Sequence, residues 1–293
     1  MESPRIGVVG GSGLYAMAGL ENVEERRVET PFGEPSDAYV VGELAGKPVA
    51  FLARHGSGHR ILPSELNFRA NICGFKLLGV DRLISVSAVG SMQPQYEPTD
   101  IVVPDQFYDR TRHRVDTFFG DGVVAHVSLA DPVCEELREI LYAAAQAEGV
   151  RVHDRGTYLC MEGPQFSTRA ESRIYRQWGV DVIGMTNLQE ARLAREAEMS
   201  YATLAMVTDY DCWHEDEADV EVADILEILR RNAATAQEVV RRAVAAIDTT
   251  APSPWKGSLR HAIITDPSLI PAETRTRLAP IAGDYLGGPR EAD

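Results

Sequence analysis

The stretch "VVGGSGLYA" (residues 8–16) begins the argument for the fold, because it joins a short apolar run to a glycine-rich turn. Residues 6–9 are predicted to form a short buried strand. Gly11, Gly13 and Ala16 then match the loose dinucleotide-binding fingerprint G-x-G-x-x-G/A. The match alone does not say which ligand the turn holds.

The dinucleotide interpretation requires a helix directly after the turn and an acidic residue about 20 positions further on, at the end of a second strand. The next segment contains Gly19 and Pro31, which leave room for little more than two helical turns. Glu29 is suitably acidic, but the helix is too short. The segment therefore disfavours a nicotinamide or flavin site.

The charge balance disfavours several classes of partner. The 293-residue chain carries 44 acidic and 29 basic residues, for a formal net charge of −15 at pH 7. This excess of negative charge opposes nonspecific binding to nucleic acid or anionic lipid. The sequence has no run of about 18 apolar residues, and its N-terminal segment lacks the basic start and apolar core of a signal peptide. We therefore expect a cytoplasmic protein.

Cysteine and histidine spacing does not predict a metal site. His55 and His59 have the i, i+4 spacing of a metal pair, but the glycines between them oppose the helix that such a pair requires. The cysteines form no C-x-x-C pair, so we expect free thiols without a disulfide framework or a zinc site. They are Cys73, Cys134, Cys160 and Cys212.

Short apolar runs alternate with amphipathic stretches along most of the chain, which predicts an α/β sheet. After the first strand, the predicted strands are residues 38–44, 48–54, 82–91, 99–107, 180–186 and 201–209. The predicted helices are residues 64–78, a segment that begins at Asp131-Pro132 and stops at Gly149, and residues 224–247. A weak amphipathic pattern covers residues 271–278.

The C-terminal part differs in composition. A proline-containing linker follows Ile247, and we expect a main domain at residues 1–250 with a C-terminal extension at residues 251–293. The extension is expected to pack on the domain or on a neighbouring subunit.

Polar and glycine residues follow five predicted strands, at the edge where α/β sheets usually bind ligands. Ser12 with its neighbouring glycines, Arg54 and Thr186 together describe a cradle for a phosphate group. A surface ion pair is the alternative role for Arg54. The flanking "HGSGH" favours the cradle, because glycines beside a charged residue permit close approach of a ligand to the backbone.

Asp209 and Asp211 follow the last predicted strand. Three interpretations compete for this pair: a solvated loop, a divalent-metal site, or hydrogen-bonding groups for a ligand with N–H edges. The pair lies directly after an apolar strand, so at least one carboxylate is expected to be partly buried. Burial raises a carboxyl pKa and makes the group a candidate proton donor near neutral pH.

Eight motifs in fixed order resemble the 5'-methylthioadenosine phosphorylases, in the trimeric branch of the purine nucleoside phosphorylases. They are "GVVGGSGLY", "TPFGEPSDA", "ARHGSGHRILPSELNFRANI", "SAVGS", "DQFYDRT", "EGPQFSTRAES", "GMTN" and "TDYDCWHE". The resemblance covers roughly residues 5–248. It implies a single-domain, three-layer α/β/α fold with a mixed, partly barrel-like central sheet.

The resemblance also implies a set of site residues. The phosphate site corresponds to Ser12, Arg54, His55, Ser87, Ala88 and Thr186. Met185 corresponds to a ribose contact and Phe166 to a contact with the purine face, while Ser167, Asp209 and Asp211 correspond to contacts with the purine edge. Val222, Ile225 and Leu226 correspond to the surroundings of the 5' group, together with His126 from a neighbouring subunit. These three apolar residues are equally suited to the inner stripe of an amphipathic helix.

The sequence departs from the family pattern at a few positions. Asn187 and Gln189 stand where a threonine and a proline are usual, and Ser12 and Ser87 stand where threonines are usual. One extra residue lies between Trp213 and residue 222, which shifts the register of the 5'-group assignments.

The function implied is phosphorolysis of 5'-methylthioadenosine to adenine and 5-methylthioribose 1-phosphate, with Asp209 as the catalytic proton donor. Inorganic phosphate is the co-substrate, and no cofactor or metal is expected. The partners implied are small molecules and further copies of the chain, in a homotrimer or a dimer of trimers. The alternatives are a phosphorylase for 6-oxopurine substrates such as methylthioinosine or inosine, a hydrolytic nucleosidase, and a non-catalytic purine-binding protein.

Overall fold

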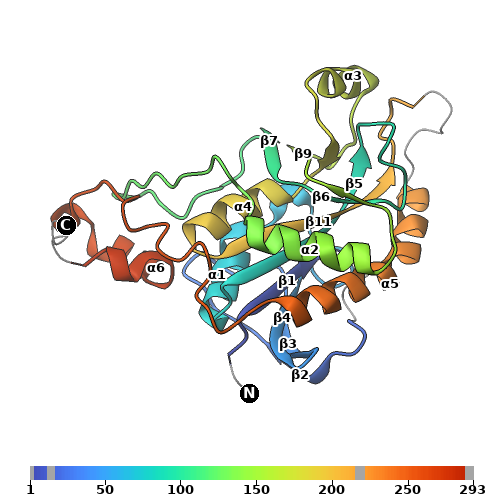
Figure 1. Cartoon of the computed structure of the whole chain (residues 1–293). Helices are drawn as coiled ribbons and strands as arrows, with labels where there is room; N and C mark the ends of the chain where they lie inside the picture. Colours follow the sequence, from blue (N-terminus) through green and yellow to red (C-terminus); the bar gives the residue numbers. More distant parts are fainter. Residues whose placement is uncertain (1–2, 12–16, 215–221, 288–293) are drawn as a thin grey trace.

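The strands of the computed structural model, which describes residues 3–11, 17–214 and 222–287, form one mixed sheet (Figure 1). For residues 222–227 and 229–232 only the backbone is described. The 11 described strands are β1 (Ile6–Gly10), β2 (Glu21–Arg26), β3 (Tyr39–Leu44), β4 (Lys47–Ala53), β5 (Arg82–Ser91), β6 (Ile101–Val103), β7 (Gln106–Arg110), β8 (Val152–Asp154), β9 (Thr157–Met161), β10 (Val182–Gly184) and β11 (Ser200–Asp209).

The sheet branches at β5. Its main path runs β2-β3-β4-β1-β5-β10-β9-β7, and a second arm leaves β5 through β11, β6 and β8. The predicted mixed sheet is confirmed, and the pairings among the described strands branch without closing into a ring. Strand β5 pairs in parallel with β1 and with β11, and all three are apolar runs buried along nearly their whole length. Such continuous apolar runs are typical of parallel strands that are covered on both faces.

One edge of β5 has a gap in its pairing. Along that edge residues 82–86 pair with β1 and residues 90–91 pair with β10, so residues 87–89 have no partner there among the described strands. The Val86 carbonyl points to this edge, where it accepts a hydrogen bond from Arg54. Successive residues of a strand direct their backbone N–H and C=O groups to alternate edges, so those of Ala88, like those of Val86, face the gap.

Helices cover both faces of the sheet, which gives the three layers. The described helices are α1 (Phe68–Leu78), α2 (Glu135–Ala147), α3 (Arg169–Gln177), α4 (Asn187–Glu196), α5 (Val222–Ala246) and α6 (Ala272–Ala282). Helix α1 packs against α4, whereas α2 packs against α5, and β11 contacts α2, α4 and α5. Helix α3 projects from the body of the molecule (Figure 1). No described helix has the length and apolar character needed to cross a membrane.

Some boundaries differ from the predictions. The helix predicted at residues 64–78 begins at Phe68, because Asn67 caps it by accepting a hydrogen bond from the Ala70 N–H, and residues 63–65 form a 3₁₀ turn. The helix predicted from Asp131-Pro132 begins only at Glu135. The strand predicted at residues 99–107 is two strands, β6 and β7, interrupted at Pro104, which has no N–H to donate.

The segment after residue 250 packs on its own chain. Trp255, Leu259 and Ile263 belong to the main hydrophobic cluster, and α6 contacts α1. The hydroxyls of Ser200 and Ser253 are hydrogen-bonded at 2.7 Å, which fastens the start of the segment to β11. The division of the chain at residue 250 stays a prediction.

Candidate active site

A cavity of about 350 Å³ lies at the carboxyl ends of β1, β5, β10 and β11. Ligands of open α/β sheets usually bind at such ends. Most of the predicted site residues line it: Arg54, His55, Ser87, Ala88, Phe166, Met185, Thr186, Asp209 and Asp211. Ala233 and Ala236 of α5 also face the cavity. Residues more than 150 positions apart in sequence thus meet at one place.

The remaining predicted site residues do not line this cavity or are not described. Ser12 lies outside the described residues, as do the side chains of Val222, Ile225 and Leu226 at the start of α5. Ser167 lies next to the cavity, where its carbonyl accepts a 3.3 Å contact from the Cys212 thiol. His126 is exposed and does not line this cavity, and its backbone N–H donates to the Ala262 carbonyl. Its assignment to a neighbouring subunit's site stays a prediction.

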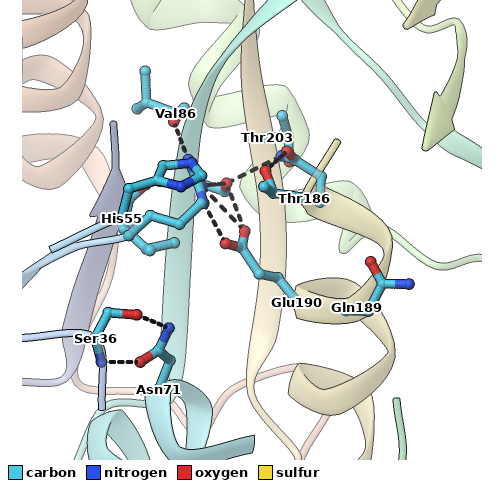
Figure 2. Close-up of polar contacts among 12 residues, drawn as sticks. Ser36, His55, Asn71, Val86, Thr186, Gln189, Glu190 and Thr203 are labelled. Carbon is cyan, nitrogen blue, oxygen red and sulfur yellow. Dashed lines mark hydrogen bonds and ion pairs between the residues drawn. The ribbon is translucent and has the colours of Figure 1, made fainter. Parts of the chain in front are cut away.

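Arg54 is buried, with 2% of its surface exposed, so the alternative of a surface ion pair is wrong. Its Nε and Nη2 reach the two carboxylate oxygens of Glu190 at 2.5 and 3.2 Å, and its Nη1 donates to the Val86 carbonyl (Figure 2). Glu190 therefore occupies the Nε–Nη2 fork of the guanidinium. One Nη1 N–H has no acceptor among the described residues.

Glu190 is the functional residue that the sequence reasoning missed. Its carboxylate also accepts hydrogen bonds from the hydroxyls of Ser85, at 2.9 Å, and Tyr201, at 3.0 Å. It lies 136 positions from Arg54 on α4, which was not predicted as a helix. The one available signal was that an arginine at a buried strand end needs a carboxylate partner.

The other described residues of the predicted phosphate site surround this ion pair, and we call Arg54, His55, Ser87, Ala88 and Thr186 the anion half of the cavity. The Ser87 hydroxyl is buried and has no hydrogen bond of ordinary geometry to a described residue. Thr186 is the N-cap of α4, and its hydroxyl donates to the Asn187 side chain at 3.1 Å. A helix N-terminus beside an unpartnered hydroxyl favours an anion.

His55 contributes a neutral ring to the anion half. Burial, and after it the nearby charge of Arg54, lowers the pKa of His55 from 6.5 to about 4. Its Nδ1 lies 2.8 Å from the Ile61 carbonyl oxygen, which can only accept a hydrogen bond. The neutral imidazole therefore carries its proton on Nδ1 and leaves Nε2 as an acceptor.

Asp209 is the best candidate for a proton donor. Burial raises its pKa from 3.8 to about 6, although hydrogen bonds from the Thr208 hydroxyl and the Asp211 N–H stabilise the charged form. The register of β11 against β5 shifts just before Asp209. A Cβ on Gly90 would lie 2.9 Å from the Asp209 Oδ1, so the close approach of the carboxylate to β5 requires glycine there.

Asp211 stands beside it with a left-handed backbone, at φ 52°. Burial raises its pKa, and the nearby Ser172 and Ser167 hydroxyls and the Cys212 N–H partly oppose that rise. The two aspartates are thus both partly desolvated, which contradicts the solvated-loop interpretation. We call Phe166, Asp209 and Asp211 the purine half of the cavity.

Met185 and the segment around residue 162 also border the cavity, which Met161, Pro164 and Met185 line. Arg114 fixes both, because its guanidinium donates to the carbonyls of Met185 and Glu162, each at 2.5 Å. It also donates to the Gln189 side chain at 3.0 Å. Phe166 lines the same cavity and has 42% of its surface exposed. A largely exposed aromatic face at the mouth of a cavity is available for stacking on a flat ligand.

Comparison with known proteins agrees with this geometry. Residues 5–245 match the family model of the phosphorylase superfamily. The S-methyl-5'-thioadenosine phosphorylase of Koribacter versatilis is 60% identical over 282 residues, which cover 96% of this chain and 97% of the relative.

Two solved structures are also similar. A methylthioadenosine phosphorylase from an antarctic soil metagenomic library is 52% identical with a TM-score of 0.91, over 96% of this chain and 99% of that one. The methylthioadenosine phosphorylase of Schistosoma mansoni in complex with adenine is 38% identical with a TM-score of 0.84, over 88% of this chain and 98% of that one. Identity of this order over nearly the whole of each chain means that this protein belongs to the phosphorylase superfamily, among the S-methyl-5'-thioadenosine phosphorylases.

Proposed function

We propose that this chain catalyses the phosphorolysis of 5'-methylthioadenosine to adenine and 5-methylthioribose 1-phosphate. The observation that carries the proposal is that the anion half and the acidic purine half line one cavity. The curated relatives of matching length act as S-methyl-5'-thioadenosine phosphorylases, and the related Schistosoma mansoni enzyme binds adenine.

The mechanism requires no protein nucleophile. Phosphate, held by the Arg54 N–H, the Ser87 hydroxyl and the Ala88 backbone, attacks C1' of the sugar while the purine departs. The glycine turn with Ser12 belongs to the same proposed phosphate site. Holding the two reactants in place supplies much of the rate, about 7 kcal/mol at the low end of well-oriented systems. The phosphate charge also stabilises the positive charge that develops on the sugar.

The departing purine gains negative charge, and Asp209 relieves it by donating a proton toward N7. The pKa of about 6 keeps part of this carboxyl protonated near neutral pH. Asp211 accepts a hydrogen bond from the rest of the purine edge, and Ser167 donates one to it. Met185 contacts the ribose. Two aspartates favour an aminopurine, because a carboxylate accepts hydrogen bonds from a 6-amino group and repels a 6-oxo group.

The 5' end of the substrate is assigned to Val222, Ile225 and Leu226. An apolar wall favours a methylthio group, but a difference of one methylene is worth only about 1–3 kcal/mol. We therefore expect adenosine to be a weaker substrate that is still turned over.

We further propose a homotrimer in the cytoplasm, with His126 of each subunit completing a neighbour's site and with phosphate as co-substrate and no cofactor. The exposure of His126 supports this role, since its side chain is available to another copy. Dilution to monomers is then expected to abolish activity, which sedimentation and assay at matched concentrations would measure.

The experiment that tests the function is adenine release from methylthioadenosine and adenosine, and hypoxanthine release from methylthioinosine, each with and without phosphate. Phosphate-dependent release, fastest from methylthioadenosine, is the expected result. Release without phosphate would indicate a hydrolytic nucleosidase, and preference for methylthioinosine would indicate a 6-oxopurine enzyme. Adenine binding without turnover of any nucleoside would indicate a non-catalytic binding protein.

A further inference from the structure

The buried polar groups beneath the anion half form a network with a fixed direction. Glu190 can only accept when ionised, so the hydroxyls of Ser85 and Tyr201 direct their protons to it. Thr203 in turn donates to the Tyr201 hydroxyl at 3.0 Å. Ser85 and Thr203 have thus used their only protons, and any further partner must donate to them.

Asn187 meets that requirement. Its Nδ2 donates to Ser85 at 3.0 Å and to Thr203 at 2.8 Å, which fixes the orientation of the amide. The amide oxygen then faces Tyr158 and Thr186, and it accepts a hydrogen bond from each hydroxyl at 3.1 Å. The proton of Thr186 is therefore directed toward Asn187, and the free positions on its oxygen are lone pairs.

Thr186 lines the cavity, so its hydroxyl faces a bound anion as an acceptor. Hydrogen phosphate carries at least one proton at neutral pH and can donate to such an acceptor, whereas sulfate carries none. The neutral ring of His55, with Nε2 unprotonated, adds a second acceptor to the same half.

We propose that Asn187 is a positioning residue for phosphate selection: it holds the Thr186 hydroxyl with its proton turned away from the cavity, so that the oxygen accepts a hydrogen bond from a protonated phosphate oxygen. The inference rests on the proposed phosphorolysis. It gives a role to a residue at which this chain departs from the usual threonine of the family pattern.

Gln189 provides a matched control. Asn187 and Gln189 are both fully buried, both lie in the first turn of α4, and both carry an amide. The Gln189 amide contacts Arg114 and Thr111, and its side chain points away from the Glu190 network (Figure 2).

The test measures the KM for phosphate and the inhibition constant of sulfate against phosphate in the wild type, Asn187→Ala, Asn187→Thr and Gln189→Ala. In Asn187→Ala the KM for phosphate is expected to rise about tenfold, the effect of losing roughly one directed hydrogen bond to a charged group. The inhibition constant of sulfate is expected to change much less, because a released Thr186 hydroxyl can donate to it. The preference for phosphate over sulfate then narrows. The same narrowing is expected in Asn187→Thr, since one short hydroxyl cannot bridge Thr186 and Ser85 together.

Gln189→Ala is expected to retain the wild-type ratio of the KM for phosphate to the inhibition constant of sulfate. An unchanged ratio in folded Asn187 variants, or equal weakening of both anions, would overturn the inference. Unfolding of both Asn187 variants alongside a folded Gln189→Ala would also overturn it, because Asn187 would then serve the fold. Absence of phosphate-dependent turnover by the wild type would overturn the proposed function itself, and this outcome is distinct from the others.

Discussion

The two halves of the cavity are built in opposite ways. The anion half sits on β4, β5 and the N-terminus of α4, and its arginine is 2% exposed and held by Glu190. The purine half sits at the end of β11 and on the loops that follow β9 and β11, and its Phe166 is 42% exposed. One half is fixed before any ligand arrives, whereas the other consists largely of connecting segments.

On the proposed function, the two halves suit two different kinds of substrate. Donors that are already oriented stabilise developing charge without rearrangement at the moment of reaction, which suits a small and strongly charged phosphate. A purine is large and flat, and loop residues can close on it after it enters. The ion pair of the first half and the exposed aromatic ring of the second can each be altered separately.

Breaking the ion pair should have the largest effect on the comparison. Glu190→Ala leaves the Arg54 charge buried without a partner and is expected to reduce the free energy of unfolding by about 3–5 kcal/mol, as measured by urea denaturation. Replacing both residues, in Arg54→Met with Glu190→Leu, is expected to restore much of that stability and none of the phosphorolysis. A free energy of unfolding of Glu190→Ala within about 1 kcal/mol of the wild-type value would show that the anion half is not held by this pair.

Asp209→Asn tests the purine half at its reacting group. The amide cannot donate the proton of a carboxylic acid, so kcat for methylthioadenosine is expected to fall at least about a hundredfold. The KM for phosphate should stay near the wild-type value, because the anion half is untouched. Turnover close to the wild-type rate would remove Asp209 from the role of proton donor.

The pKa of Asp209 predicts an effect of pH on stability. Its pKa in the folded chain, about 6, is above the ordinary 3.8, so the folded state binds a proton more tightly than the unfolded state does. The resulting stabilisation is full below about pH 4 and is lost as pH rises through 6. Buried Glu196, with a pKa raised to about 7, acts in the same direction.

The corresponding measurement is urea denaturation of the wild type and Asp209→Asn between pH 4 and 7. The free energy of unfolding of the variant is expected to fall by roughly 1–3 kcal/mol less over this range, because the variant lacks the Asp209 contribution. Parallel stability profiles for the two proteins would contradict the burial of the Asp209 carboxyl.

Phe166→Ala should have the smallest effect of these variants, and it tests the exposed aromatic ring of the purine half. Loss of a stacking face worth about 0.5–1.5 kcal/mol is expected to raise the KM for methylthioadenosine about threefold to tenfold. Stability and the KM for phosphate should change little, because the ring is largely exposed. An equal rise in both KM values would show that the halves are coupled.

The sequence predicts the central strands well, because β5 and β11 are long apolar runs whose burial is visible in their composition. It does not reveal β2, which is short and mostly charged, or β8 and β9. Helix α4 also escapes prediction: it is buried nearly all round and several of its buried residues are polar, so its buried surface does not form an apolar stripe.

The same reason explains what was missed in the site. Arg54 could be predicted from its glycine-rich surroundings, but Glu190 lies on the unrecognised helix and meets Arg54 only in the folded chain. Asn187 and Gln189 are visible in the sequence only as departures from a pattern. Their roles depend on hydrogen-bond partners that tertiary structure supplies, which no local signal records.

The gap along β5 has a consequence for how this protein tolerates change. Where residues 87–89 lack a neighbouring strand, backbone N–H and C=O groups remain unpaired and are available to the ligand. Every amino acid that keeps the strand extended supplies the same backbone groups. Side-chain replacement there cannot remove them. If the proposed phosphate site is correct, a share of anion recognition is hidden from alanine scanning and is inherited with the topology of the sheet, independently of the residue types on it.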